Sequence, residues 1–92
     1  MPEFDWDANK SAANKKKHGV SFKEATEIWS SVHITVSNLA RSQDGEKRGA
    51  TIGIIGSRLY TAIWTKRKDK LRLISVRSAR DGEKRIYRKK TL

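Results

Sequence analysis

One histidine stands where its chemistry could act on a phosphodiester. His18 lies in the segment KHGV at positions 17–20, directly after three consecutive lysines. Imidazole transfers protons near neutral pH, and neighbouring cations favour the neutral form that a general base needs. His18 is therefore a candidate general acid or base. A histidine that bonds the last carbonyls of a helix would occupy the same position, and from the sequence alone that capping role is favoured.

Arginines form the second candidate group, because the guanidinium group offers phosphate two parallel hydrogen bonds. The candidates among the arginines in or between the segments that we expect to be strands are Arg48, Arg67, Arg72 and Arg77. Arg72 and Arg77 are five residues apart on one expected strand, so we expect them to point to opposite faces of the sheet. The inward one needs a carboxylate partner or a cleft, and Glu46 and Glu83 are the candidate partners. A solvated surface is the alternative for each arginine.

Other basic and aromatic side chains could extend this set. Lys10, Asn14 and either Lys17 or His18 recur at helical spacing, which predicts a polar, cationic helix face. Tyr60 shares one face of an expected strand with Trp64, and aromatic rings in such places can stack on RNA bases. We expect Trp64 to belong to the core instead.

The site types that the sequence lacks narrow the chemistry. It contains no phosphate-binding glycine loop, no dinucleotide-binding motif and no zinc-ligand spacing. Its ten carboxylates are scattered except for Asp5 and Asp7, so we expect no metal site and no cofactor. A basic protein can still cleave RNA by promoting attack of the 2′-hydroxyl on the adjacent phosphate, for which lysine, histidine and arginine suffice.

The charge indicates what the protein binds. Lysine and arginine number 21 against 10 acidic residues, which gives a net charge of +11 over 92 residues. So large a positive field attracts polyanions, of which nucleic acid ranks first, an acidic protein second and an anionic membrane third. A surface that is basic only for solubility remains the alternative.

Length and residue usage favour one small cytoplasmic domain over residues 1–92. A chain of this size has a thin core that a partner protein could stabilise. The absence of cysteine excludes a disulfide framework and fits a reducing cytosol. The acidic, polar first ten residues do not resemble a secretory signal, and no apolar run is long enough to span a bilayer, so no membrane partner is expected.

Two helices are predicted at the start of the chain. Asp7 can cap a helix that runs to about His18, with Gly19 as its left-handed terminator. Ser21 and Glu24 form a capping box for a second helix. That helix carries an apolar stripe at helical spacing which we assign to the core: Phe22, Ala25, Ile28 and Trp29.

After Trp29 the hydrophobic period changes to two, which predicts strands. A loop with an Asp44-Gly45 turn separates the first two strands, and Gly56-Ser57 suits a tight hairpin. The expected strands are residues 32–37, 50–55, 59–65 and 71–77, followed by a helix over residues 80–90. The resulting fold class is α+β: two N-terminal helices packed on a four-stranded antiparallel meander, with a C-terminal helix whose narrow apolar stripe predicts loose docking.

Taken together, these segments resemble BrnT-type toxins over nearly the whole chain, in order and at the right spacing. The stretch WDANKSAANKKKHGVSF resembles the start of that family, and GEKRGATIG resembles its middle motif. WTKRKDKLRLISVRSA resembles its last two strands, and Glu83 and Tyr87 match its last helix. One departure is Arg80, where the resemblance leads us to expect a threonine cap. Gly82 follows in the first turn and costs up to about 1 kcal/mol relative to alanine.

The resemblance implies a RelE-like fold, metal-independent endoribonuclease activity and growth arrest by the free toxin. It also implies neutralisation by a BrnA-like antitoxin with a ribbon-helix-helix part, in a complex that binds operator DNA and represses its own operon. By the same resemblance the catalytic positions are His18, Lys17, Arg48, Arg67 and Arg77. Arg72, Tyr60 and Lys10 are the candidate RNA-binding residues. The alternative is a non-enzymatic module that binds nucleic acid or an acidic partner, including an inactive relative that acts only as a co-repressor.

Overall fold

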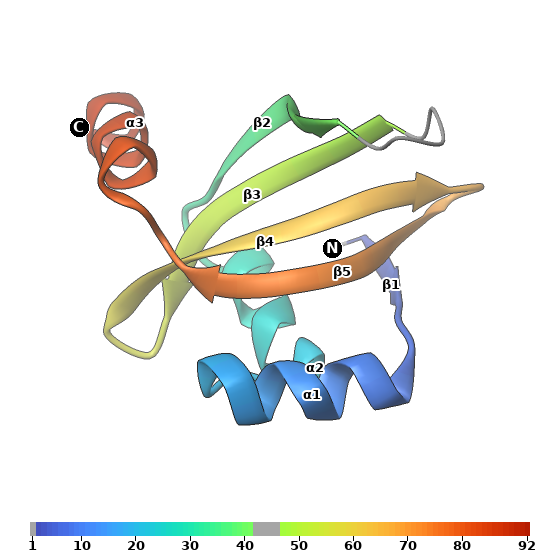
Figure 1. Cartoon of the computed structure of the whole chain (residues 1–92). Coiled ribbons are helices and arrows are strands. Elements are labelled where there is room, and N and C mark those ends of the chain that lie inside the picture. Colours follow the sequence, from blue (N-terminus) through green and yellow to red (C-terminus); the bar gives the residue numbers. More distant parts are fainter. Residues whose placement is uncertain (1, 42–46) are drawn as a thin grey trace.

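The computed structural model describes residues 2–41 and 47–92. The protein is built on a five-stranded sheet with helices on both faces (Figure 1). Figure 1 shows the two N-terminal helices on one side of the sheet and the C-terminal helix on the other. The α+β class is therefore confirmed. None of the helices within these residues is long and apolar enough to cross a membrane.

The sheet contains the predicted antiparallel meander and one further strand. The meander strands are β2 (Ile34–Arg41), β3 (Lys47–Ile55), β4 (Arg58–Arg67) and β5 (Lys70–Ser78). The prediction of a purely antiparallel, four-stranded sheet was wrong, because β1 (Glu3–Asp5) pairs in parallel with β5, giving the order β1-β5-β4-β3-β2. A strand of three residues is too short to show a hydrophobic period, and its partner lies far along the chain.

Strand boundaries differ from the prediction near the first hairpin. Val32 lies before β2 and is 64% exposed, so it does not belong to the apolar face of that strand. The strand instead continues to Arg41, through the first residues of the expected loop. The predicted Asp44-Gly45 turn lies outside the described residues. The Gly56-Ser57 turn is confirmed, since β3 ends at Ile55 and β4 begins at Arg58.

The first helix, α1 (Ala8–His18), has the predicted caps. The Asp7 carboxylate accepts a hydrogen bond from the Lys10 amide at 3.0 Å, and Gly19 ends the helix at φ 80°. The prediction that Asn14 belongs to a polar, cationic helix face with Lys10 was wrong. Asn14 is buried, its Nδ2 donates to the carbonyls of Val20 and Val76, and its Oδ1 accepts from the Val76 amide. Asn14 therefore ties α1 to β5.

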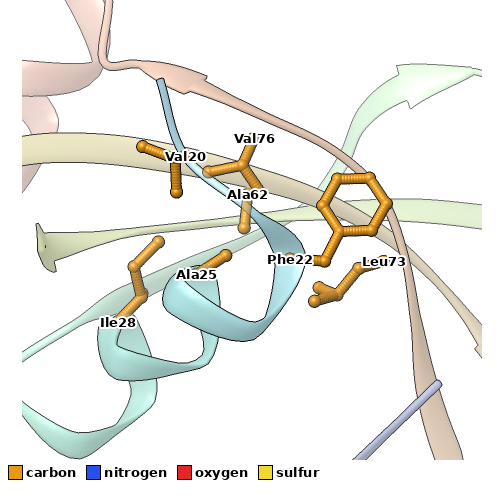
Figure 2. Packing of buried hydrophobic residues seen from close by; sticks show 7 residues of the cluster. All are labelled: Val20, Phe22, Ala25, Ile28, Ala62, Leu73 and Val76. Atoms are coloured by element: carbon orange, nitrogen blue, oxygen red, sulfur yellow. The ribbon is translucent and has the colours of Figure 1, made fainter. Parts of the chain in front are cut away.

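The second helix is a single α-turn, α2 (Phe22–Ala25), that tightens into a 3₁₀ helix, η1 (Thr26–Ser30). Its predicted capping box is confirmed. Of its predicted core stripe, Phe22, Ala25 and Ile28 are buried, and Trp29 packs partly buried against them. Figure 2 shows the cluster that this segment forms with the sheet: Val20, Phe22, Ala25, Ile28, Ala62, Leu73 and Val76. A Cβ atom on Gly53 would lie 2.7 Å from Cγ2 of Ile28, so η1 packs this closely because β3 has glycine there.

The last helix, α3 (Asp81–Thr91), packs on the opposite face of the sheet. Tyr87 and Glu83 point inward and are both buried. The Tyr87 hydroxyl donates to the Val32 carbonyl at 2.9 Å, and Tyr87 packs with Ile52 and Ala79. Despite the missing threonine cap, the Glu83 carboxylate accepts a hydrogen bond from the Arg80 amide at 2.8 Å and closes the first turn.

A β-bulge in β5 decides which side chains share the face under α3. Ile63 pairs with Ser75 and Trp64 pairs with Leu73, so Ile74 is skipped in this register. The extra residue reverses the alternation of β5. Arg72 pairs with Thr65 and Arg77 with Thr61, and the two threonines lie four residues apart on one face of β4. The prediction that Arg72 and Arg77 point to opposite faces was therefore wrong.

Candidate active site

A hollow of about 490 Å³ lies on the α3 side of the sheet, where β3, β4 and β5 meet the start of that helix. We call it the arginine pocket. Its walls carry three guanidinium groups, one carboxylate, one hydroxyl and two aliphatic side chains: Arg48, Arg77, Arg80, Glu83, Ser75, Ile63 and Ile74. Positive charge with a small apolar wall suits a phosphate group joined to a sugar or base.

Strand pairing explains why the arginines converge. Thr65 of β4 is flanked by Arg48 on β3 and by Arg72 on β5, which form one row across the sheet. Arg77 lies in a second row, opposite Thr61. Directly paired residues project from the same face, so these side chains all leave the sheet on the α3 side. The bulge at Ile74 is the reason that Arg72 and Arg77 of β5 project from the same face.

Arg77 is held by a two-pronged ion pair with Glu83. Its Nη1 lies 2.8 Å from Oε1 and its Nη2 lies 3.0 Å from Oε2. Glu83 was a predicted carboxylate partner, and for Arg77 that prediction is confirmed. Glu46, the other candidate, lies outside the described residues.

The electrostatics of Glu83 follow from the same contacts. Burial alone would raise the pKa of Glu83, but hydrogen bonds from Arg77, the Arg80 amide and Thr61, with the charge of Arg77, outweigh it and lower the pKa to about 2. Glu83 is therefore ionised at neutral pH. Four donors occupy it, so it is suited to fixing the Arg77 fork and poorly suited to taking up a proton.

Arg48 and Arg80 differ from Arg77 because no carboxylate of residues 2–41 or 47–92 holds them. The Nε of Arg48 is buried and has no hydrogen-bond partner among the described residues. The side chain of Arg80 is exposed at the N-cap of α3. A buried donor without an acceptor is costly. An anion in the pocket would supply the counter-charge that Arg48 and Arg80 lack among the described residues.

The predicted acid–base group lies elsewhere. Asn14 joins α1 to Val76, whose side chain belongs to the core cluster on the face that α1 and α2 cover. Arg77 projects from the opposite face. His18 and Lys17 are in the last turn of α1, which lies on the opposite face of the sheet from α3 (Figure 1), and neither lines the arginine pocket. Lys10, in the first turn of the same helix, is exposed on that side as well.

The remaining predicted residues do not line the arginine pocket. Arg67 is exposed at the end of β4. Arg72 binds Asp5 at 2.7 Å and so links β5 to β1, which lowers the pKa of Asp5. Tyr60 and Trp64 do share a face, as predicted, but it is the face that α1 and α2 cover, opposite the arginine pocket. The indole of Trp64 donates to Thr51 Oγ1 at 2.9 Å, which fits its predicted place in the core.

Sequence reasoning missed part of this pocket. Arg80 attracted attention only as an unexpected cap, and Ser75, Ile63 and Ile74 carried no chemical signal. The i to i+3 spacing of Arg80 and Glu83 is one signal that could have placed Arg80 beside Glu83. Within residues 2–41 and 47–92, no group of three or more His, Cys, Asp or Glu side chains is arranged to hold a metal ion.

Comparison with known proteins adds one finding. The family model described as the ribonuclease toxin BrnT of type II toxin–antitoxin systems matches residues 6–83. The matched range includes both rows of arginines, the bulge and Glu83. No curated protein sequence matches the chain.

Proposed function

The chain belongs to the BrnT family of ribonuclease toxins from type II toxin–antitoxin systems, and from that premise we propose that it is an endoribonuclease that binds the scissile phosphate of RNA in the arginine pocket. The observation that carries this proposal is that Arg48 lines the pocket without an ion pair to any described residue, together with the guanidinium of Arg77 that Glu83 holds in place. One guanidinium group held in place and a second one open to an acceptor form a site prepared for an oxyanion.

The reaction that fits these groups needs no cofactor. The 2′-hydroxyl oxygen of RNA attacks the adjacent phosphorus, the bond from phosphorus to the 5′-oxygen breaks, and the products carry a 2′,3′-cyclic phosphate and a 5′-hydroxyl. The 2′-hydroxyl loses a proton and the leaving oxygen gains one. Negative charge grows on the non-bridging oxygens in the transition state, where Arg48 and Arg77 stabilise it most.

Glu83 acts in this scheme as a positioning residue. Its carboxylate holds both Nη atoms of Arg77, so the guanidinium does not have to be ordered when the phosphate arrives. A Lys at position 77 would keep the charge but lose the two-pronged geometry.

The roles proposed for His18 and Lys17 are tested separately from those of the arginines. A general base must come within about 3 Å of the hydroxyl it deprotonates, or reach it through one water. Because α1 lies across the sheet from the arginine pocket, a single bound phosphate fits Arg48 and Arg77 together more readily than it fits either of them with His18.

Family membership also implies a protein antitoxin as partner and RNA as substrate. The finer proposal is a BrnA-like, ribbon-helix-helix antitoxin that neutralises the toxin, with the complex repressing its own operon through operator DNA. The net charge of +11 supports an acidic contact surface on that partner. Co-purification with the product of the neighbouring gene, followed by an operator gel shift of the complex, tests both parts.

The first experiment is cleavage of a defined RNA by the purified protein in EDTA. Arg48→Gln is the most informative variant because Arg48 forms no ion pair within the described residues, so its loss should leave folding intact. We expect its cleavage rate to fall about 10²–10³-fold, the usual effect of removing one transition-state donor. His18→Ala and Arg77→Lys run alongside, with Lys16→Gln, an exposed lysine of α1, as the charge control.

Two results would overturn this proposal. One is unchanged cleavage by Arg48→Gln and Arg77→Lys. The other is cleavage of a substrate that carries 2′-deoxyribose at the scissile nucleotide, since that substrate lacks the attacking hydroxyl. A large loss in His18→Ala alone would move the chemistry to α1. If the RNA stays intact in EDTA, the assay is repeated on translating ribosomes, which separates a ribosome-dependent enzyme from an inactive one.

A non-enzymatic binding module is the second candidate function, and one observation favours it. Among the described residues that line the arginine pocket, Glu83 is the only carboxylate and no histidine occurs, while the Glu83 pKa of about 2 makes it a weak base. This second function would be established if the protein binds RNA, loses that binding when the pocket arginines are replaced, and never cleaves the RNA on or off the ribosome.

A further inference from the structure

A second basic hollow lies on the other side of the junction between β5 and α3. It measures about 390 Å³ and is formed by the β3–β4 hairpin, the end of β5 and the middle of α3. Three cationic side chains, two hydroxyls and one aliphatic side chain line it: Arg58, Lys84, Arg88, Ser57, Ser78 and Leu59. No carboxylate is among them.

Among the residues that the structure describes, the three cations of this hollow lack the carboxylate partners that Arg72 and Arg77 have. Arg58, Lys84 and Arg88 form no ion pair or side-chain hydrogen bond in the part of the chain that the structure describes. By contrast, Arg72 and Arg77 are each fixed by a carboxylate. Lys84 is half-buried, so it brings its charge against the wall of the hollow instead of extending into solvent. Like charges gathered without counter-charges repel each other, and a bound anion removes that repulsion.

The two hollows are neighbours along the chain. At the end of β5, Arg77 lines the arginine pocket and Ser78 lines the second hollow. At the start of α3, Glu83 lines the arginine pocket and Lys84 lines the second hollow. A polyanion that crosses the start of α3 therefore meets both. With donors on nearly every wall and Leu59 as the only aliphatic side chain among its described lining residues, the second hollow suits a phosphate better than a base or an apolar peptide.

We propose that this second hollow binds another phosphate of the same RNA strand, next to the phosphate in the arginine pocket. The ligand rests on the proposed function, since the RNA is that of the nuclease. Arg58 and Arg88 would supply guanidinium forks, Lys84 a point charge and the two serines hydroxyl donors. The hollow takes no part in bond breaking, so it acts on substrate affinity and on KM rather than on kcat.

The test uses a matched pair of double variants in α3. Lys84→Gln with Arg88→Gln removes two charges from the second hollow. Arg85→Gln with Lys89→Gln removes the same charge, on the same helix and at the same i, i+4 spacing, from exposed positions outside it. The probe is a short single-stranded RNA whose 2′-hydroxyls are methylated, so that binding is measured without cleavage.

We expect the hollow variant to bind this probe about tenfold more weakly than the control variant, the effect of removing one charge-assisted hydrogen bond. The slope of log affinity against log salt should also become shallower by about 0.7 for each phosphate that the variant no longer neutralises. On cleavable RNA, KM should rise with kcat unchanged. Thermal unfolding of both variants checks that the helix is intact.

Equal affinities of the two double variants would overturn the proposal, as would a wild type that does not bind the probe. Selective loss of binding to an acidic peptide, with RNA binding unchanged, would also overturn it and make the hollow a contact for an acidic protein. A wild type that binds the probe through this hollow but never cleaves RNA would leave the second phosphate site standing and defeat only the nuclease function.

Discussion

Replacing Glu83 by glutamine should destabilise the protein, and it should do so in a pH-dependent way. The Glu83 side chain is 10% exposed and accepts hydrogen bonds from Arg77, Thr61 and the Arg80 amide. Glutamine keeps one acceptor oxygen but turns an amide donor toward the guanidinium of Arg77. Arg77, itself only 20% exposed, then keeps its charge without a counter-charge.

The magnitude follows from the pKa. The pKa of Glu83 falls from 4.5 to about 2 on folding, which corresponds to roughly 3 kcal/mol at about 1.4 kcal/mol per pH unit. Because the folded-state pKa is the lower one, this stabilisation is fully present above pH 4.5 and is lost as the pH falls toward 2. At pH 7 we expect Glu83→Gln to lose about 2–3 kcal/mol of unfolding free energy. The wild type and the variant should converge near pH 2.

Urea unfolding of both proteins between pH 7 and pH 2 measures this difference directly. Glu24→Gln is the control, because hydrogen bonds from Lys15 and Ser21 lower the pKa of Glu24 to about 2 as well. However, the side chains of Glu24 and Lys15 are 44% and 54% exposed, so water replaces their contact and the loss should be far smaller. Equal losses in the two variants, or a Glu83→Gln effect that does not change with pH, would refute the reasoning.

Three further substitutions test the packing that positions the pocket. Gly49→Ala should destabilise the protein by about 1–3 kcal/mol in urea unfolding, because its Cβ would lie 2.5 Å from the Trp64 ring; an unchanged midpoint would show that the indole moves freely. Asn14→Ala should cost about 2–4 kcal/mol by leaving buried groups of Val76 and its neighbours unpaired, and a loss below about 1 kcal/mol would contradict that role. Tyr87→Phe should cost about 1 kcal/mol and speed amide exchange in α3, whereas unchanged exchange would show that its hydroxyl does not hold the helix.

The parts of the fold that the sequence predicts are those that depend on neighbouring residues. The Asp7 cap, the Gly19 terminator and the Ser21–Glu24 capping box each need partners only three or four positions away, and all are present. β1 escaped prediction because its partner, β5, begins at Lys70. Asn14 was assigned to a polar, cationic helix face because helical spacing shows which residues share a face, but not which face the sheet covers.

The candidate site was harder to predict for a related reason. Alternation along β5 puts Arg72 and Arg77 on opposite faces unless one residue is skipped, and nothing in the local sequence announces that Ile74 is the residue that bulges. The register is set by pairing with β4, where Thr61 and Thr65 keep a regular alternation. The pocket thus exists because of a cross-strand property that a single strand does not carry.

The distribution of charge over the two faces is more informative than its total. Lysines dominate the last turn of α1, where cations stabilise the helix dipole whether or not they bind anything, and one of them is already paired with Glu24. Arginines dominate the α3 side, where Arg48 has a buried donor that no described residue satisfies. Strong basicity alone therefore favours contact with RNA in general. What favours one particular phosphate is that Arg48, which has no ion pair among the described residues, lines the same pocket as Arg77. Arg48→Gln is therefore a sharper test of catalysis than any change to the lysines of α1.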